Sequence, residues 1–217
     1  MKTVLRGRVG EDVTVCDGCG MDYACVICSL DGDEIVLDAH SQAPSEAEPR
    51  RKITLYQGLP KADKMEMIIQ KCVELGVEEI VAVSTERAIV KLDKKEEKKL
   101  ERWQKIAEAA AKQSSRGKIP QMRGRVLSFG EAVKDATGLD GALIPYEKEE
   151  TNDLRGFVQG FSGETIGVFI GPEGGFSEKE IALAVEYGVL PVTLGKRILR
   201  TETAGMTTIG ILLYELG

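Results

Sequence analysis

Histidine is almost absent from the sequence. His40 is the single one among 217 residues, and we expect no catalytic role for it because it precedes a polar stretch. No apolar run approaches the roughly 18–20 residues that span a bilayer. The first residues, Met1–Arg6, lack the apolar region and the small-residue cleavage site of a signal peptide. We therefore expect a cytoplasmic protein with no membrane partner.

An excess of positive charge is also missing, since the formal net charge is −6. A protein that coats nucleic acid by bulk attraction is therefore not expected. Residues 111–126 nevertheless contain no acidic residue and five basic ones, namely Lys112, Arg116, Lys118, Arg123 and Arg125. Such a segment is typical of a solvated surface, but it is also enough to neutralise a few RNA phosphates. Both interpretations stay open on the composition alone.

The five cysteines do not indicate a disulfide framework, because their number is odd and no secretion signal is present. Four of them form the pairs Cys16-x-x-Cys19 and Cys25-x-x-Cys28, which resemble zinc ligands. The spacer between the pairs is much shorter than the ~15 residues usual in such sites. The two stretches also fit a β-hairpin that turns near Asp17, with Cys25 and Cys28 on opposite faces. We therefore expect no metal site.

Residues 1–58 have the pattern of a small all-β domain. Short alternating stretches cover 12–16, 23–29, 34–38 and 52–57, with Gly, Asp and Pro between them. Residues 41–50 are polar and irregular and predict a loop. The expected architecture is a barrel or a partly open sheet.

Residues 59–217 change to alternating helices and strands. The predicted helices cover 63–76, 95–115, 130–136, 177–187 and 203–216, and the predicted strands cover 79–84, 125–129, 141–145, 165–170 and 190–194. This alternation is typical of an α/β domain whose parallel sheet is covered on both faces. The last helix is apolar enough for either a core or an interface.

The sharpest motif is Gly171-Pro-Glu-Gly-Gly175, which lies between a predicted strand and a predicted helix. Ser177 and Glu180 form a capping box that fixes the start of the helix. Glycines in such a turn let backbone amides approach a ligand closely. The turn lacks a P-loop lysine, and Glu173 would repel a phosphate, so a cationic ligand such as S-adenosylmethionine fits better. An ordinary βα turn is the alternative.

A second polar segment follows the predicted strand 190–194. Thr201 and Thr203 are candidate N-caps of the helix after it. Three charged residues fall at the carboxyl edge of the sheet, where open α/β folds bind ligands: Arg197, Arg200 and Glu202. A surface salt-bridge cluster at a helix start is the alternative.

Several segments together resemble one family of RNA methyltransferases. They are Lys64-Met-Glu-Met-Ile-Ile-Gln-Lys71 with Glu74-Leu-Gly76, Thr85-Glu-Arg87, Glu101-Arg-Trp-Gln-Lys-Ile106, Ala109-Ala-Ala-Lys-Gln-Ser-Ser-Arg116 with Ile119-Pro120, Ile170-Gly-Pro-Glu-Gly-Gly-Phe-Ser177 and Leu194-Gly-Lys-Arg-Ile-Leu-Arg-Thr-Glu-Thr-Ala204. The family is RsmE of the SPOUT superfamily, which methylates N3 of a uridine in 16S ribosomal RNA. The resemblance covers nearly the whole chain in the right order.

The resemblance implies that residues 1–58 are a PUA-like β-barrel that binds RNA. It implies that residues 59–217 are a SPOUT methyltransferase domain with a deep C-terminal trefoil knot. A homodimer that acts on the small ribosomal subunit and holds S-adenosylmethionine at the knot is expected. Carried over by position, the cofactor contacts are Ile144, Pro145, Gly171, Pro172, Glu173, Gly174, Gly175, Leu194, Gly195, Arg197, Ile198 and Leu199.

The resemblance also bears on the contacts with RNA. Family members usually have a further strand before Val4-Leu5-Arg6, so we expect the β-domain to lack its first strand. The four hairpin cysteines are not a feature of the family. An RNA enzyme needs phosphate contacts, and the expected ones are Arg6, Lys112, Arg116, Lys118, Arg123 and Arg125.

Methylation of uridine N3 requires removal of its proton, for which a carboxylate is a suitable general base. Glu202 and Glu173 are the candidates, and Arg200 or Arg197 would stabilise charge on the carbonyl oxygens of the ring. A non-catalytic RNA-binding or ribosome-assembly module on the same fold is the alternative function. A phosphotransferase is disfavoured by the acidic turn and the missing P-loop lysine.

Overall fold

The computed structural model describes residues 7–32, 34–88 and 96–217. The chain forms two compact units, Met1–Glu48 with Ala111–Ile119 and Pro49–Ala110 with Pro120–Gly217. Within the described ranges, no helix is both long and apolar enough to cross a membrane.

The first unit contains an antiparallel sheet in the order β1 (Asp12–Cys16), β2 (Met21–Asp31), β3 (Glu34–Pro44). The predicted hairpin is confirmed, and Cys25 is buried whereas Cys28 is exposed, as expected. Strand β3 extends to Pro44, so the loop predicted from residue 41 begins later. Residues Ala39–Pro44 of β3 are exposed and include no large apolar side chain, so a search for alternating hydrophobicity does not detect this part of the strand.

Strand β4 (Lys52–Gly58) corrects the predicted domain boundary. It lies between β9 (Thr165–Ile170) and β5 (Glu79–Ser84) at the centre of the parallel sheet, not in the β-domain. Residues 53–58 are all buried, because a central parallel strand is covered on both faces. The boundary therefore lies between Glu48 and Pro49 rather than after residue 58, and Ala111–Ile119 belongs to the first unit.

The second unit is a parallel α/β sheet in the order β10-β8-β9-β4-β5-β6, with β7 also paired to β5. The remaining strands are β6 (Gln121–Met122), β7 (Leu127–Ser128), β8 (Gly141–Pro145) and β10 (Leu190–Val192). The helices are α1 (Lys64–Leu75), α2 (Glu96–Gln113), α3 (Phe129–Ala136), α4 (Leu154–Gly160), α5 (Glu178–Glu186) and α6 (Thr201–Leu216).

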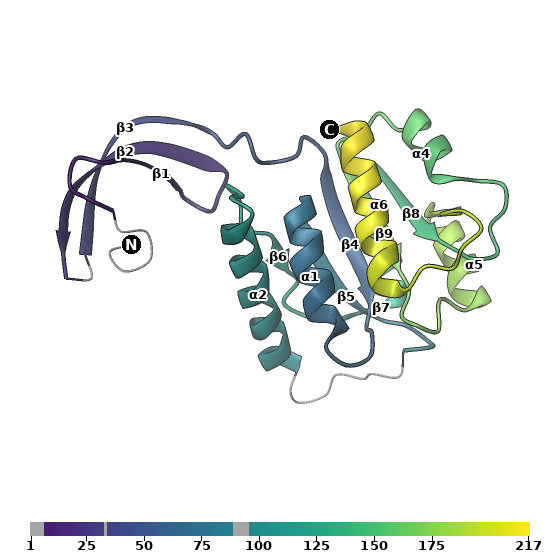
Figure 1. Cartoon of the computed structure of the whole chain (residues 1–217). Helices are drawn as coiled ribbons and strands as arrows, with labels where there is room; N and C mark the ends of the chain where they lie inside the picture. Colours follow the sequence, from purple (N-terminus) through teal and green to yellow (C-terminus); the bar gives the residue numbers. More distant parts are fainter. Residues whose placement is uncertain (1–6, 33, 89–95) are drawn as a thin grey trace. The chain divides into compact units, whose positions relative to one another are not determined.

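Helices cover both faces of this sheet. Helices α1 and α6 pack against each other on one face, in front of β4 and β9 in Figure 1. Helices α3 and α5 pack together around a second core, in which Tyr56 stacks on Phe169 with ring centroids 4.4 Å apart. Side chains alternate along β4, so Tyr56 contributes to this core and the neighbouring Gln57 faces α6.

The sequence missed some elements of the second unit. Helix α4 was not predicted, and the strand expected over 125–129 is reduced to β7. Helix α6 begins at Thr201 with Arg200 as its N-cap, so neither Thr201 nor Thr203 caps the helix as predicted.

Candidate functional site

Three loops meet at the carboxyl ends of the adjacent strands β8, β9 and β10 and enclose a cavity of about 1070 Å³. The loops are 145–150, 170–176 and 193–201, and Lys64 and Ala204 complete the wall. Open α/β sheets bind their ligands at this end of the strands. All the lining residues belong to the second unit.

The structure brings together every predicted cofactor contact except Ile144. Ile144 is fully buried in β8 and belongs to the hydrophobic core, so its side chain does not form part of the wall. Of the predicted catalytic residues, Arg200 and Glu173 line the cavity. Glu202 lies beside it, one residue after Thr201, which does line it.

The glycine turn after β9 is held from both sides. Gly175 has a φ of +64°, in the left-handed region that favours glycine, and its N–H donates to the Pro172 carbonyl at 2.9 Å. Arg87 donates from Nη1 to the Gly174 carbonyl at 3.0 Å. A Cβ on Gly174 would lie 3.1 Å from the Cβ of Arg87, so a larger residue would force the two segments apart.

The predicted capping box at the start of α5 is confirmed. The Ser177 hydroxyl accepts from the N–H of Glu180 at 3.2 Å, and the Glu180 carboxylate accepts from the N–H of Ser177 at 2.8 Å. Its other oxygen accepts from the N–H of Glu86 at 2.8 Å. Glu180 therefore joins the start of α5 to the loop that carries Arg87.

A buried chain of hydrogen bonds connects β4, α6 and the glycine turn. Gln57 is fully buried, and its Nε2 donates to the Gly58 carbonyl at 2.9 Å and to the Thr201 hydroxyl at 3.0 Å. The Thr201 hydroxyl in turn donates to the Gly171 carbonyl at 2.6 Å. This chain fixes the start of α6 against the glycine turn.

Lys64, at the start of α1, joins the two predicted carboxylates. Its Nζ lies 2.8 Å from Oε1 of Glu173 and 3.6 Å from Oε2 of Glu202. Burial raises the pKa of Glu173, but hydrogen bonds from Lys64 and from backbone N–H groups outweigh it, and the pKa lies below its ordinary value. The hydrogen bond to Glu173 raises the pKa of Lys64. Lys64 and Glu173 therefore form an ion pair at neutral pH.

Charges of both signs line the rest of the cavity. Lys196, Arg197 and Arg200 are exposed on the loop after β10. The facing loop after β8 contributes Glu147, Glu149 and Glu150. A wall of this composition suits a zwitterionic or cationic ligand better than a phosphate.

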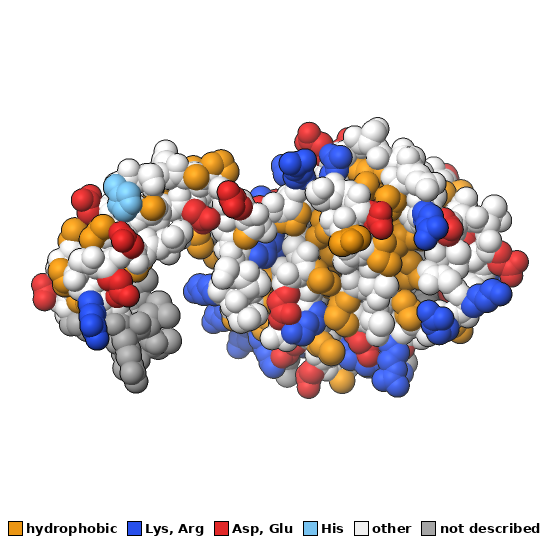
Figure 2. All heavy atoms as spheres, turned by 45° about the horizontal axis from the view of Figure 1, so that its top comes forward, with side chains coloured by type: hydrophobic (Ala, Val, Ile, Leu, Met, Phe, Trp, Pro, Cys, Tyr) orange, Lys and Arg blue, Asp and Glu red, His pale blue; other side chains and the backbone are white. Residues whose placement is uncertain are grey.

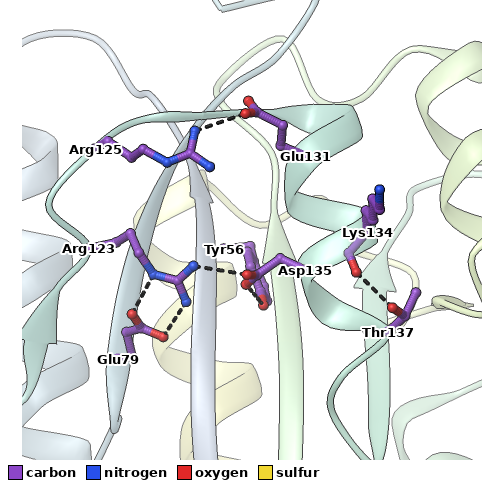
Figure 3. Close-up of polar contacts among 8 residues, drawn as sticks. All are labelled: Tyr56, Glu79, Arg123, Arg125, Glu131, Lys134, Asp135 and Thr137. Atoms are coloured by element: carbon purple, nitrogen blue, oxygen red, sulfur yellow. Dashed lines mark hydrogen bonds and ion pairs between the residues drawn. The ribbon is translucent and has the colours of Figure 1, made fainter.

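The predicted RNA-binding segment has acidic partners that come from elsewhere in the chain, as Figure 3 shows for two of its arginines. Arg123 forms a bidentate pair with Glu79, at 2.6 and 2.7 Å, and a third bond to Asp135 at 3.0 Å. Arg125 pairs with Glu131 at 2.8 Å, but 62% of its side chain remains exposed. Arg125 can still meet a phosphate, whereas Arg123 has its guanidinium committed to two carboxylates.

Arg116 does not have the exposed position that was predicted for an RNA contact. Its side chain is only 3% exposed and pairs with Glu48 at 2.6 Å inside the first unit, so it is a structural residue rather than an RNA contact. Lys112 is exposed and Lys118 is half-buried. Arg6, the remaining predicted contact, lies outside the described residues.

The cysteines of the first unit are all free thiols. Cys16, Cys19 and Cys28 are exposed and Cys25 is buried. Among the residues that the structure describes, no three His, Cys, Asp or Glu side chains come close enough together to hold a metal ion.

Sequence reasoning missed Lys64, Gln57 and Thr201 as parts of the site. Lys64 lies within a segment that carries the family resemblance, but its spacing gives no sign that it faces Glu173, 109 positions later. Gln57 offered a weak signal, since it is a polar residue near the carboxyl end of a predicted strand. A buried glutamine in such a place must find hydrogen-bond partners.

Comparison with known proteins agrees with this geometry. Residues 46–213 match the RNA methyltransferase domain family. The ribosomal RNA small subunit methyltransferase E of Bacillus subtilis is 34% identical over 98% of this chain and 85% of its own length.

Two solved structures are similar over 97% of this chain and 86% of their own chains, each at 34% identity. One is a ribosomal RNA small subunit methyltransferase E from Neisseria gonorrhoeae bound to S-adenosylmethionine, with a TM-score of 0.85. The other is a methyltransferase from Legionella pneumophila in complex with the same cofactor, with a TM-score of 0.82. The fold, the cavity and these similarities together show that the chain belongs to the RsmE family of ribosomal RNA small subunit methyltransferases, with a SPOUT-type RNA methyltransferase domain.

Proposed function

We propose that this protein transfers a methyl group from S-adenosylmethionine to N3 of a uridine in the 16S RNA of the small ribosomal subunit. The observation that carries the proposal is the cavity at the carboxyl ends of β8, β9 and β10, which is lined by both family motifs. The relatives with this fold that are bound to S-adenosylmethionine support the choice of cofactor.

The residues of the cavity fit this cofactor. Its volume of about 1070 Å³ exceeds the few hundred Å³ that a ligand of this size needs, which leaves room for a nucleotide base. The glycine turn and the loop after β10 would hold the adenosine through backbone groups. The acidic loop after β8 suits the amino group and the sulfonium, and Arg197 suits the carboxylate.

When bound, the cofactor supplies an electrophilic methyl group on sulfur. The protein then has to hold the uridine in line with that methyl, which accounts for much of the acceleration in such reactions. Glu202 or Glu173 accepts the N3 proton, and Arg200 or Arg197 stabilises negative charge on the ring oxygens. Arg200 lies directly before the first residue of α6, so the start of this helix favours the same negative charge.

We further propose that the first unit is a PUA-like RNA-binding domain and that the end of the chain is knotted. Lys112 and Arg125 remain available for phosphates, and Lys118 and Arg6 are retained as proposed contacts. Support for the knot comes from the segment after β10, where the N–H of Thr193 donates to the Asn152 carbonyl at 2.8 Å. That hydrogen bond joins the residue directly after β10 to the loop that precedes α4.

A homodimer is proposed through the exposed apolar side chains of α6 and the loop before it. Ile198 and Tyr214 are each 87% exposed and Ile211 is 41% exposed. On the face of the larger unit shown in Figure 2, hydrophobic side chains gather in a patch in the region of α6. We expect Tyr214→Arg to convert a dimer to a monomer in sedimentation equilibrium, and a wild-type protein of monomer mass would contradict the proposal.

The function is tested by transfer of labelled methyl from S-adenosylmethionine to small ribosomal subunits that lack the modification. An N3-methyl blocks base pairing, so reverse transcription is expected to stop at one uridine of the 16S RNA. Cofactor binding without transfer to any subunit or RNA would contradict the proposed substrate. A protein that binds RNA but no cofactor would instead support the assembly-module alternative.

A further inference from the structure

Lys64 is a single cation between two carboxylates from different elements. It comes from α1, Glu173 comes from the glycine turn, and Glu202 comes from the first turn of α6. Lys64 and Glu173 both line the cavity, and Glu202 is within 3.6 Å of the Lys64 ammonium. The two carboxylates can therefore interact with each other as well as with Lys64.

The two carboxylates are held very differently. Glu173 accepts a hydrogen bond from Lys64, and the N–H of Lys61 approaches its two oxygens at 3.2 and 3.3 Å. Glu202 is too far from Lys64 for a hydrogen bond. Its Oε2 is buried and has no hydrogen-bond partner in the described part of the chain. A buried carboxylate oxygen with no donor is costly, and such groups concentrate at functional sites.

We propose that Lys64 is a positioning residue that neutralises Glu173 and so leaves Glu202 as the carboxylate that accepts the uridine proton. The inference rests on the proposed function and assigns a separate role to each of the two candidate bases. Both oxygens of Glu173 have donors, and Glu173 serves to hold Lys64 and the turn. Glu202 has an oxygen without a donor beside the cavity.

The N3–H bond of uridine breaks and its proton forms an O–H bond on Glu202. The electron pair left on N3 forms the new bond to the methyl carbon, and the electron pair of the broken carbon–sulfur bond stays on sulfur. Glu202 later releases the proton to water. Throughout, the Lys64–Glu173 pair keeps a net charge of zero.

Without Lys64, two carboxylates would face each other with no cation between them. Like charges at short range favour a proton shared between the two groups. Glu202 would then be protonated for part of the time and unable to accept the uridine proton. Replacement of Glu173 by glutamine removes this competing charge, so it should compensate for the loss of Lys64.

The experiment compares Lys64→Met, Glu173→Gln, Lys64→Met/Glu173→Gln, Lys64→Arg and Glu202→Gln. Lys71→Met is the matched control, because Lys71 pairs with Glu74 at 2.8 Å on the same helix and does not line the cavity. Each variant is checked by its melting temperature, by calorimetric titration with S-adenosylmethionine, and by single-turnover methyl transfer to unmethylated small subunits.

We expect Glu202→Gln to lower the transfer rate at least a hundredfold, with a cofactor Kd within threefold of wild type. Lys64→Met should lower the rate at least tenfold, and the double variant should recover most of that loss. Lys64→Arg should stay near wild type. A double variant no faster than Lys64→Met would overturn the role of Lys64, and a fully active Glu202→Gln would overturn the role of Glu202.

A second measurement needs no RNA and separates this inference from the proposed function. Lys64→Met removes a positive charge and makes the site more negative, so the ratio of the Kd for neutral S-adenosylhomocysteine to that for cationic S-adenosylmethionine should rise several-fold. The double variant should restore the ratio, and an unchanged ratio in Lys64→Met would contradict the charge-neutralising role. Wild-type protein that methylates no ribosomal RNA would contradict the proposed function and the base role of Glu202, but this ratio would still test Lys64.

Discussion

Thr201 shows how one hydroxyl can control a binding site. It accepts a hydrogen bond from Gln57 and donates one to the Gly171 carbonyl, so its loss leaves one N–H of Gln57 and the Gly171 carbonyl without these partners. We expect Thr201→Val, which keeps the shape of the side chain, to weaken S-adenosylmethionine binding about tenfold, because tenfold in Kd is ~1.4 kcal/mol and one such bond contributes about 0.5–1.5 kcal/mol. Isothermal titration calorimetry measures the change.

Thr201→Ser is the matched control, because serine keeps the hydroxyl. It should bind the cofactor within about threefold of wild type. Equal Kd values for the valine variant and wild type would show that the chain of hydrogen bonds does not position the glycine turn.

Asp135 makes the stability of the fold depend on pH in the acidic range. It accepts hydrogen bonds from Tyr56 at 2.7 Å and from Arg123 at 3.0 Å (Figure 3). Burial raises its pKa, but these two donors outweigh the effect and hold the pKa below its ordinary value. A carboxylate with a lowered pKa in the folded state stabilises the fold above its unfolded pKa of ~3.9, and this contribution is lost as the pH falls through the folded pKa.

We therefore expect Asp135→Asn to lower the free energy of unfolding by about 1–2 kcal/mol at pH 7. The difference from wild type should shrink as the pH falls below ~3.9, because wild type then loses the same charge. Urea unfolding at pH 7 and pH 3 tests this. Tyr56→Phe is the control, since it removes one donor and keeps the stacked ring. Parallel curves for wild type and Asp135→Asn would contradict the assignment.

The residues that act through contacts with distant segments were the least predictable part of the site. The lining by Gly171–Gly175 was predicted from a glycine-rich turn after a strand, and the lining by Leu194–Leu199 from the family resemblance carried over by position. Lys64 and Gln57 act through contacts with residues more than a hundred positions away. The local sequence pattern around Lys64 and Gln57 does not indicate those contacts.

At the scale of elements, the two capping boxes provide a matched pair. Ser177 and Glu180 at the start of α5 are each 7% exposed, whereas Ser128 and Glu131 at the start of α3 are exposed. Glu180 also accepts from the N–H of Glu86. We expect Glu180→Ala to cost about 1–3 kcal/mol of unfolding free energy, because it leaves the N–H of the buried Ser177 without an acceptor and also removes the acceptor of the Glu86 N–H.

Glu131→Ala should cost only about 0.5–1 kcal/mol, because water can reach the groups that it leaves free. Urea denaturation of the two variants and wild type measures both losses. Equal losses would mean that burial does not set the value of a capping box here. The box at Ser177 was predictable because its partners are three residues apart, but the contact with Glu86 was not.

The misplaced strand β4 has a similar explanation. Its sequence Lys52–Gly58 alternates like the strands before it and follows directly after them, so proximity assigned it to the β-domain. In the structure it pairs with β9, more than a hundred residues later, and with β5. The choice between the two sheets depends on those non-local pairings, which alternation alone does not specify.

At the scale of the whole molecule, the cavity lies entirely in the second unit, and the first unit has its own internal contacts. Most of α2 belongs to the second unit, but the segment Ala111–Ile119, which begins in the last turn of that helix, belongs to the first unit. Arg116 in this segment pairs with Glu48, which closes the first unit on itself. Its basic neighbours had suggested an RNA contact because the sequence does not show a partner 68 positions earlier.

This division predicts a separation of effects for Arg116. Removal of one partner from a buried ion pair leaves the other charge uncompensated, at a typical cost of 3–5 kcal/mol. We expect Arg116→Met to destabilise the first unit and to weaken binding of the small subunit RNA, measured by filter retention. Its Kd for S-adenosylmethionine should stay within about twofold of wild type, because every residue that lines the cavity lies in the second unit. An Arg116→Met protein that loses cofactor binding while it remains folded would show that the first unit contributes to the cofactor site after all.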